Sequence, residues 1–91
     1  MKKPLRVLVT AGASGIGRVL AETFAEAGAQ VHICDISVDA LLEVAKIYPN
    51  WGISQCDVSD ETQVTQLFSE VKIKLGGLDV LINNAGVAGP T

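Results

Sequence analysis

The segment from Thr10 to Gly17, with the sequence TAGASGIG, constrains the fold of this chain more than any other feature. It joins a short apolar run, residues 5–9, to a segment with helical periodicity. Glycine adopts positive φ without strain and lets the backbone approach a pyrophosphate, whose charge is then stabilised at a helix N-terminus. A glycine-rich turn between a strand and a helix therefore predicts a Rossmann-type unit that binds a dinucleotide.

Strand and helix patterns alternate along the whole chain. Four short apolar runs predict strands at residues 5–9, 30–34, 52–56 and 78–82. Helices are expected between them, the first from Ile16 to Ala27, the second capped by Ser37 and ended by Pro49, the third capped by Ser59 and ended by Gly76. With right-handed crossovers, this order predicts an α/β fold with a parallel sheet of strand order 3-2-1-4 and flanking helices. Residues 1–91 then form one domain, a truncated half of a doubly wound fold.

The helical patterns also predict which side chains face the sheet. In the first helix the expected buried stripe is Ile16, Val19, Leu20, Thr23, Phe24 and Ala27. In the third helix it is Val64, Leu67, Phe68, Val71 and Leu75. Capping of the third helix by Ser59 would leave Asp57 free for a ligand.

Composition excludes several classes of protein. With 48% hydrophobic and 19% charged residues the chain is globular, and a net charge of −3 without a Lys/Arg cluster argues against a nucleic-acid partner. The apolar run Val7–Val9 is too short for a signal peptide, so we expect a cytoplasmic protein without a membrane segment. Cys34 and Cys56 lack metal-ligand spacing and are expected to be free, buried thiols, with no metal site.

Asp35 lies 20 residues beyond Gly15, directly after the second apolar run. A carboxylate there can accept both hydroxyls of an adenine ribose. It also repels a 2′-phosphate, which favours NAD over NADP. The alternative is a solvated carboxylate that caps the backbone near Ser37.

Two further segments follow strands at the same edge of the predicted sheet. Asp57 could accept the adenine amino group while Val58 packs on the ring, although Asp57 could instead be a helix-capping acid. Residues 83–86, with the sequence NNAG, follow the fourth strand at the crevice where the strand order reverses. Their small side chains leave room for a ribose, but an Asn/Gly turn that ends a strand is the simpler alternative.

Taken together, these segments resemble the short-chain dehydrogenases/reductases, which share a TGxxxGIG turn, an acid after the second strand, a DV pair and an NNAG segment. All four occur here in order and span essentially the whole chain. The resemblance implies that Ser14 and Ile16 contact the phosphates and that Asn83 holds the sheet together, and Asp35 narrows the cofactor to NAD. The full set of cofactor-binding residues that we predict is Gly12, Ser14, Gly15, Ile16, Gly17, Asp35, Asp57, Val58, Asn84, Ala85 and Gly86.

The chain departs from the family pattern in two places. Ala11 stands where the family has its first glycine, so we expect either a slightly reshaped turn or a cofactor that is held less closely. Binding should survive, because Gly12 is still available. The family's catalytic Ser and Tyr-x-x-x-Lys have no counterpart, because the one tyrosine, Tyr48, has no lysine four residues on. We therefore predict the N-terminal, cofactor-binding half of an NAD-dependent oxidoreductase acting on an alcohol or ketone, inactive by itself. It would need its missing half or associate with itself through exposed apolar surface.

Two other functions fit the same patterns. One is a stand-alone nucleotide-binding module, and the other is a fragment of an S-adenosylmethionine-dependent methyltransferase, which also has a glycine-rich turn and acids after its second and third strands. The NNAG segment and the Ile16–Gly17 helix start fit the dehydrogenase pattern better. His32 and Trp51 are expected to pack in the interior and to bind nothing.

Overall fold

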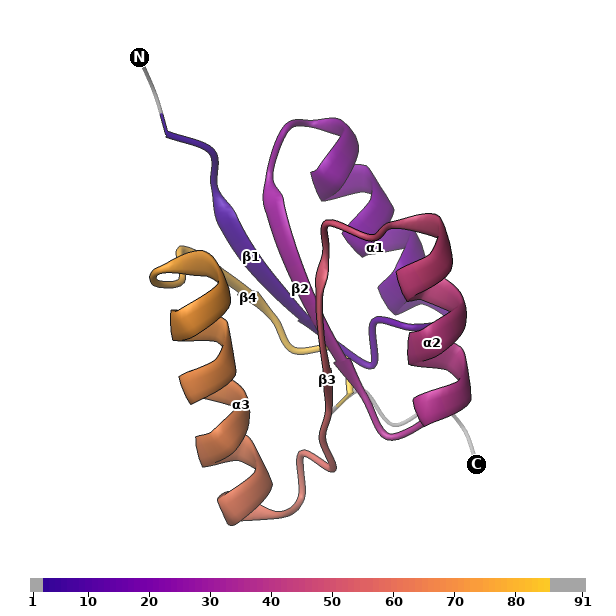
Figure 1. The fold of residues 1–91 in the computed structure, drawn as a ribbon, viewed down its shortest axis with the longest axis vertical. Coiled ribbons are helices and arrows are strands. Elements are labelled where there is room, and N and C mark those ends of the chain that lie inside the picture. The colour runs from indigo at the N-terminus through magenta and orange to yellow at the C-terminus, as the bar shows by residue number, and fades with distance from the viewer. Residues whose placement is uncertain (1–2, 86–91) are drawn as a thin grey trace.

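The computed structural model describes residues 3–85 of the chain, so the predicted site residue Gly86 lies outside the described part. Strands and helices alternate as the sequence predicts (Figure 1). In chain order they are β1 (Arg6–Thr10), α1 (Gly15–Glu26), β2 (Gln30–Asp35), α2 (Val38–Ile47), β3 (Gly52–Gln55), α3 (Glu61–Leu75) and β4 (Val80–Ile82).

The four strands form one parallel sheet in the order β3-β2-β1-β4, which confirms the predicted order. The sheet lies between two helical layers, with α1 and α2 on one face and α3 on the other (Figure 1). β4 has three residues and is shorter than the predicted run from residue 78. Asp79 lies before it and holds Arg6 through a salt bridge of 3.0 Å.

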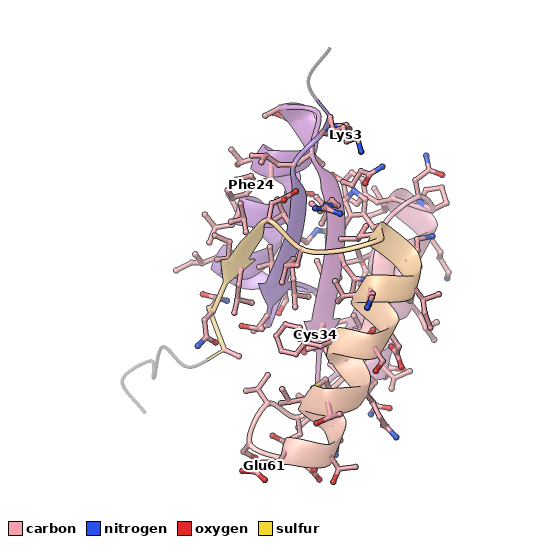
Figure 2. The ribbon with its side chains drawn as sticks, turned by 90° about the vertical axis from the view of Figure 1, so that its left-hand side faces the viewer. Lys3, Phe24, Cys34 and Glu61 are labelled. Atoms are coloured by element: carbon pink, nitrogen blue, oxygen red, sulfur yellow. The ribbon has the colours of Figure 1, made fainter. Side chains whose placement is uncertain are left out.

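The central strand β1 is buried on both faces, which explains its continuous apolar sequence. Val7, Leu8 and Val9 are all 0% exposed. Val7 and Val9 belong to the core on the α1 and α2 side, whereas Leu8 belongs to the core under α3. Cys34 also faces α3, as Figure 2 shows, and both cysteines are free.

Helix α1 turns only part of the predicted stripe toward the sheet, where Phe24 packs against the core. Gly17 and Ala21 are its buried residues, whereas Ile16 and Val19 are 73% and 60% exposed. The reason is close packing, because a Cβ atom on Gly17 would lie 2.1 Å from the Ala11 carbonyl oxygen. The predicted stripe was therefore wrong for these two large residues, and Thr23 and Ala27 are exposed as well.

Helix α3 also corrects two predictions. Its N-cap is Asp60, whose carboxylate accepts the Thr62 and Gln63 N–H groups, and not Ser59. Of the predicted stripe, Leu67 and Val71 are buried and Val64 and Leu75 pack at its margin, but Phe68 is 41% exposed. No helix within residues 3–85 is both long and apolar enough to cross a membrane.

His32 and Trp51 pack as predicted, although His32 does so through a polar network. Its Nε2 atom lies 2.7 Å from the Ser54 hydroxyl, which in turn donates to Glu70. The Nδ1 atom is buried without a partner, and burial lowers the pKa of His32 to about 4. Trp51 stacks on Tyr48 with ring centres 4.1 Å apart.

Candidate functional site

The segments that follow the four strands meet at the carboxyl edge of the sheet. A pocket of about 250 Å³ opens there between Ala11, Asp35, Ile36, Cys56, Asp57, Val58 and Ala85. A larger hollow of about 430 Å³ lies at the opposite edge, between residues 3–6, Gln30, Leu75 and Asp79. We place the site in the smaller pocket, because ligands of open α/β sheets bind outside the carboxyl ends of the strands.

The glycine turn lies close to the sheet because Gly12 and Gly17 have no side chains. A Cβ atom on Gly12 would lie 2.7 Å from Ile33 Cγ2, and one on Gly17 would lie 2.1 Å from the Ala11 oxygen. The Gly12 N–H already donates to the Cys34 carbonyl at 3.0 Å. Its N–H is therefore not available to a ligand, and Gly12 can contribute to binding only by its lack of a side chain. At Gly15, φ is +58° and a Cβ atom would meet nothing within 4 Å, so the space in front of the turn is open.

Ala11 keeps the backbone shape that glycine would give. Its φ is 51°, and it is the one non-glycine residue with positive φ among those described. This left-handed conformation strains the backbone of an alanine by roughly 1–2 kcal/mol. In this position the Ala11 carbonyl faces Gly17 and accepts the Asn84 side-chain amide at 3.4 Å.

Of α1, α2 and α3, only α1 has an N-terminus that no side chain caps. Its N-cap Ser14 makes no side-chain capping bond, and its first turn contains no acid. In contrast, Ser37 caps α2 and Asp60 caps α3, and each of these helices carries an acid in its first turn. The first amide groups of a helix attract anions, so the start of α1, from Ser14 through Ile16 to Gly17, is suited to a phosphate group.

Asp35 ends β2, where its carboxylate caps the following turn and also lines the pocket. Its Oδ1 accepts the Ser37 N–H at 3.1 Å, as expected of a carboxylate that caps the following turn. Its Oδ2 accepts the Ala13 N–H at 3.2 Å, and the side chain lines the pocket. Each carboxylate oxygen has two lone pairs, so both can still accept a bond from a ligand hydroxyl.

Asp57 and Val58 lie together in the pocket, but Asp57 is not free as predicted. Its Oδ1 accepts the Ser59 hydroxyl at 2.6 Å and the Ser59 N–H at 2.9 Å. These two bonds lower the pKa of Asp57, so its carboxylate stays ionised. Its backbone N–H donates to Gln63 Oε1 at 2.8 Å, which fixes the loop between β3 and α3.

Thr10, which the sequence analysis left out of the site, joins the glycine turn to the segment after β4. Its hydroxyl donates toward Asn83 Oδ1 at 3.3 Å and accepts the Ala85 N–H at 2.8 Å. Asn83 thus contacts the end of β1, and Asn84 and Ala85 lie beside the turn. A polar threonine at the end of an apolar strand was the signal in the sequence, because a buried hydroxyl needs hydrogen-bond partners. In the structure Thr10 is 5% exposed.

Ile36 and Cys56 also line the pocket and were not predicted to do so. Burial raises the pKa of the Cys56 thiol, and that of Cys34 to about 12, so both remain neutral thiols. Their contribution to the pocket is apolar surface. They were missed because an apolar residue next to a strand gives no pattern that separates a core position from a pocket wall.

Comparison with known proteins agrees with this geometry. Residues 5–91 match the short chain dehydrogenase family. The chain is 38% identical over 87 residues to the 7alpha-hydroxysteroid dehydrogenase of Escherichia coli (strain K12), covering 91% of this chain and 34% of that protein. It is 40% identical to a short chain dehydrogenase/reductase of Colletotrichum higginsianum, covering 88% of this chain and 31% of that protein.

Solved structures give the same result. A crystal structure of a hydroxysteroid dehydrogenase from Escherichia coli superimposes with a TM-score of 0.83 at 36% identity, covering 96% of this chain and 37% of that one. A short-chain dehydrogenase from Streptomyces avermitilis also gives 0.83, at 32% identity, covering 93% and 32%. The chain thus spans about a third of the length of the relatives that it matches.

Proposed function

The chain belongs to the short chain dehydrogenase family, and from this premise we propose that it is the NAD-binding portion of an oxidoreductase that transfers hydride between NAD and an alcohol or ketone. The observation that carries the proposal is the convergence of the open glycine turn, Asp35 and the Asp57–Val58 pair at one pocket. The family match favours this function over a methyltransferase.

The turn and the start of α1 are suited to the pyrophosphate. The absence of side chains at Gly12 and Gly17 keeps the backbone close to the sheet, and the open space at Gly15 leaves room for a ligand. Ser14 caps no N–H of its own helix, so its hydroxyl can bind a phosphate oxygen. Helix amide groups supply the remaining donors without a competing acid in the first turn.

The pocket is suited to the adenosine. Asp35 would accept the ribose hydroxyls, and its charge would repel the 2′-phosphate of NADP. Asp57 would accept the adenine amino group while the half-exposed Val58 side chain packs on the ring. Asn84, Ala85 and Gly86 would line the ribose on the nicotinamide side, next to the turn that Asn84 contacts. The bound nicotinamide supplies the hydride acceptor or donor.

We assign no catalytic residue within the 91 residues. Tyr48 is unsuited to acid/base chemistry at this site, because its hydroxyl donates to Glu22 at 2.6 Å and it lies at the far end of α2 from Ser37. That hydrogen bond raises the pKa of Tyr48. We place the protein in the cytoplasm and expect no dehydrogenase turnover from this chain alone. Measurable reduction of NAD with any alcohol would contradict that expectation.

Among residues 3–85, β4 pairs with β1 alone, so its other edge could pair with a partner. Leu81 in β4 is 47% exposed, and Phe68 and Val19, on opposite helical layers, are 41% and 60% exposed. These apolar side chains would pack against a catalytic half that extends the sheet beyond β4, or against a second copy of this chain. Sedimentation of the isolated chain as a monomer at all concentrations would argue against self-association.

Isothermal titration with NAD, NADP and S-adenosylmethionine tests the proposed ligand. We expect NAD to bind most tightly, because Asp35 accepts ribose hydroxyls and repels a 2′-phosphate. Tighter binding of NADP would contradict the assignment of NAD, and tighter binding of S-adenosylmethionine would contradict the oxidoreductase. A stand-alone nucleotide-binding module would give the same order of affinities, but it would gain no turnover when a catalytic half is supplied.

A further inference from the structure

The Asp35 carboxylate is hydrogen-bonded on both oxygens before any ligand arrives. Oδ2 accepts the Ala13 N–H at 3.2 Å and Oδ1 accepts the Ser37 N–H at 3.1 Å. Asp35 therefore connects the end of β2 to two other parts of the site, the glycine turn and the N-cap of α2.

The bond to Ala13 holds a buried part of the turn. Ala13 is only 3% exposed and lies between Gly12, whose N–H donates to the Cys34 carbonyl, and Ser14, which begins α1. Two neighbouring N–H groups of the turn thus bond to two neighbouring residues at the end of β2. Without the carboxylate, the Ala13 N–H would be buried without a partner, unless the turn moved to reach water.

We propose that Asp35 is a positioning residue for the phosphate-binding turn, in addition to its role in binding the adenine ribose. One carboxylate then couples recognition of the ribose to recognition of the pyrophosphate. This inference rests on the proposed nucleotide site. It assigns Asp35 a second task, which is performed through Ala13 and needs no ribose.

The change in anion affinity on removal of the Asp35 carboxylate has opposite signs for a positioning role and for a purely electrostatic effect. Removing a negative charge beside an anion site should strengthen the binding of an anion that does not touch the carboxylate. Loss of the hydrogen bond to Ala13 should weaken the binding of this anion, because the turn no longer holds its amide groups in place. A ligand without ribose or adenine therefore reports on the turn alone.

Titration of inorganic pyrophosphate into the 91-residue chain is the experiment that we suggest. Asp35→Ala should lower the affinity on the order of tenfold, as expected for loss of a hydrogen bond to a charged group. Asp39→Ala is the matched control, because it removes one carboxylate from the exposed first turn of α2. It should leave the affinity unchanged or raise it slightly. Equal or tighter binding of pyrophosphate by Asp35→Ala would overturn the proposal.

A second measurement needs no variant and no ligand. In the wild-type chain, hydrogen exchange of the Ala13 amide should be slow, because its N–H donates to Asp35 and is buried. Rapid exchange of this amide beside protected β1 amides would overturn the proposal. If neither NAD nor pyrophosphate binds the wild-type chain, the proposed function fails, whereas the exchange rate still tests the bond between Asp35 and the turn.

Discussion

Acidification from about pH 7.5 to about pH 5 should remove about 2 kcal/mol of the free energy of unfolding through His32 alone. His32 in β2 is 2% exposed, and Ser54 of β3 links its ring to Glu70 of α3. The Ser54 hydroxyl donates to Glu70, so it accepts from His32 Nε2–H, and the neutral ring leaves Nδ1 without a proton. A proton added at Nδ1 would be buried without an acceptor.

The magnitude follows from the shift in pKa. Burial lowers the pKa of His32 from 6.5 to about 4, with the Glu70 carboxylate opposing the shift and the Lys74 ammonium adding to it. Because the pKa is lower in the folded state, the stabilisation is complete above the unfolded pKa and is lost as the pH falls from 6.5 toward 4. At about pH 5 the unfolded state binds the proton and the folded state largely does not, which gives the loss of about 2 kcal/mol.

Urea denaturation of the wild-type chain and of His32→Gln at both pH values measures this loss. Glutamine does not titrate, so the wild type should lose about 2 kcal/mol more than the variant between the two conditions. Titration of the carboxylates outside the network of His32, Ser54 and Glu70 affects both proteins alike and cancels. An equal loss in both proteins would show that the pKa of His32 is not lowered in the folded state. If the variant does not fold, an NMR titration of the wild-type imidazole decides, because a measured pKa near 6.5 would contradict the buried, unpartnered Nδ1.

Three further predictions concern the turn and α3. Gly17→Ala should lower the free energy of unfolding by at least about 2 kcal/mol in urea denaturation, because its Cβ atom would overlap backbone atoms. Gly15→Ala should lower it by only about 1 kcal/mol, because of its positive φ. Equal losses would count against the close contact at Gly17. Ala11→Gly should raise the melting temperature and the free energy of unfolding, the latter by up to about 1 kcal/mol. The relief of backbone strain exceeds the added entropy of the unfolded chain. A lower melting temperature would contradict the left-handed conformation of Ala11. Asp60→Ala should cost about 1 kcal/mol as a lost N-cap and Ser59→Ala less than about 0.5 kcal/mol; the reverse order would restore Ser59 as the cap.

The order of the sheet could be predicted because the alternation of strands and helices leaves few topologies. Right-handed crossovers and the apolar run of β1 place this strand in the centre, and the four segments after the strands then meet at one edge. That is why Asp35, Asp57 and Ala85, which are far apart in the sequence, were correctly expected near one another.

The face of α1 could not be predicted from hydrophobic spacing, because the contact is made by small residues. Gly17 and Ala21 let the helix lie against the sheet, and a pattern weighted by large apolar side chains selects Ile16 and Val19 instead. Such a pattern does not reveal that Gly17 has no room for a Cβ atom, which depends on the position of the Ala11 carbonyl.

The hydrogen-bond partners at the site could not be predicted from the sequence either. Ser59 and Asp60 are both good N-caps, and only the path of the chain decides that Asp60 takes this role while Ser59 bonds to Asp57. For Asp35, a capping role and a ligand-binding role were treated as alternatives. Its two oxygens point to different N–H groups and still line the pocket, so the two roles are compatible.

Amide chemical shifts of the isotope-labelled chain, recorded as NAD is added, test the nucleotide site most directly. We predict saturable changes at the glycine turn and the start of α1, at Asp35, at Asp57 and Val58, and at Asn84. We predict none at the hollow on the opposite edge, near Arg6 and Leu75. Absence of any change at millimolar NAD, or changes confined to that opposite edge, would contradict the assignment of this pocket as a dinucleotide-binding site.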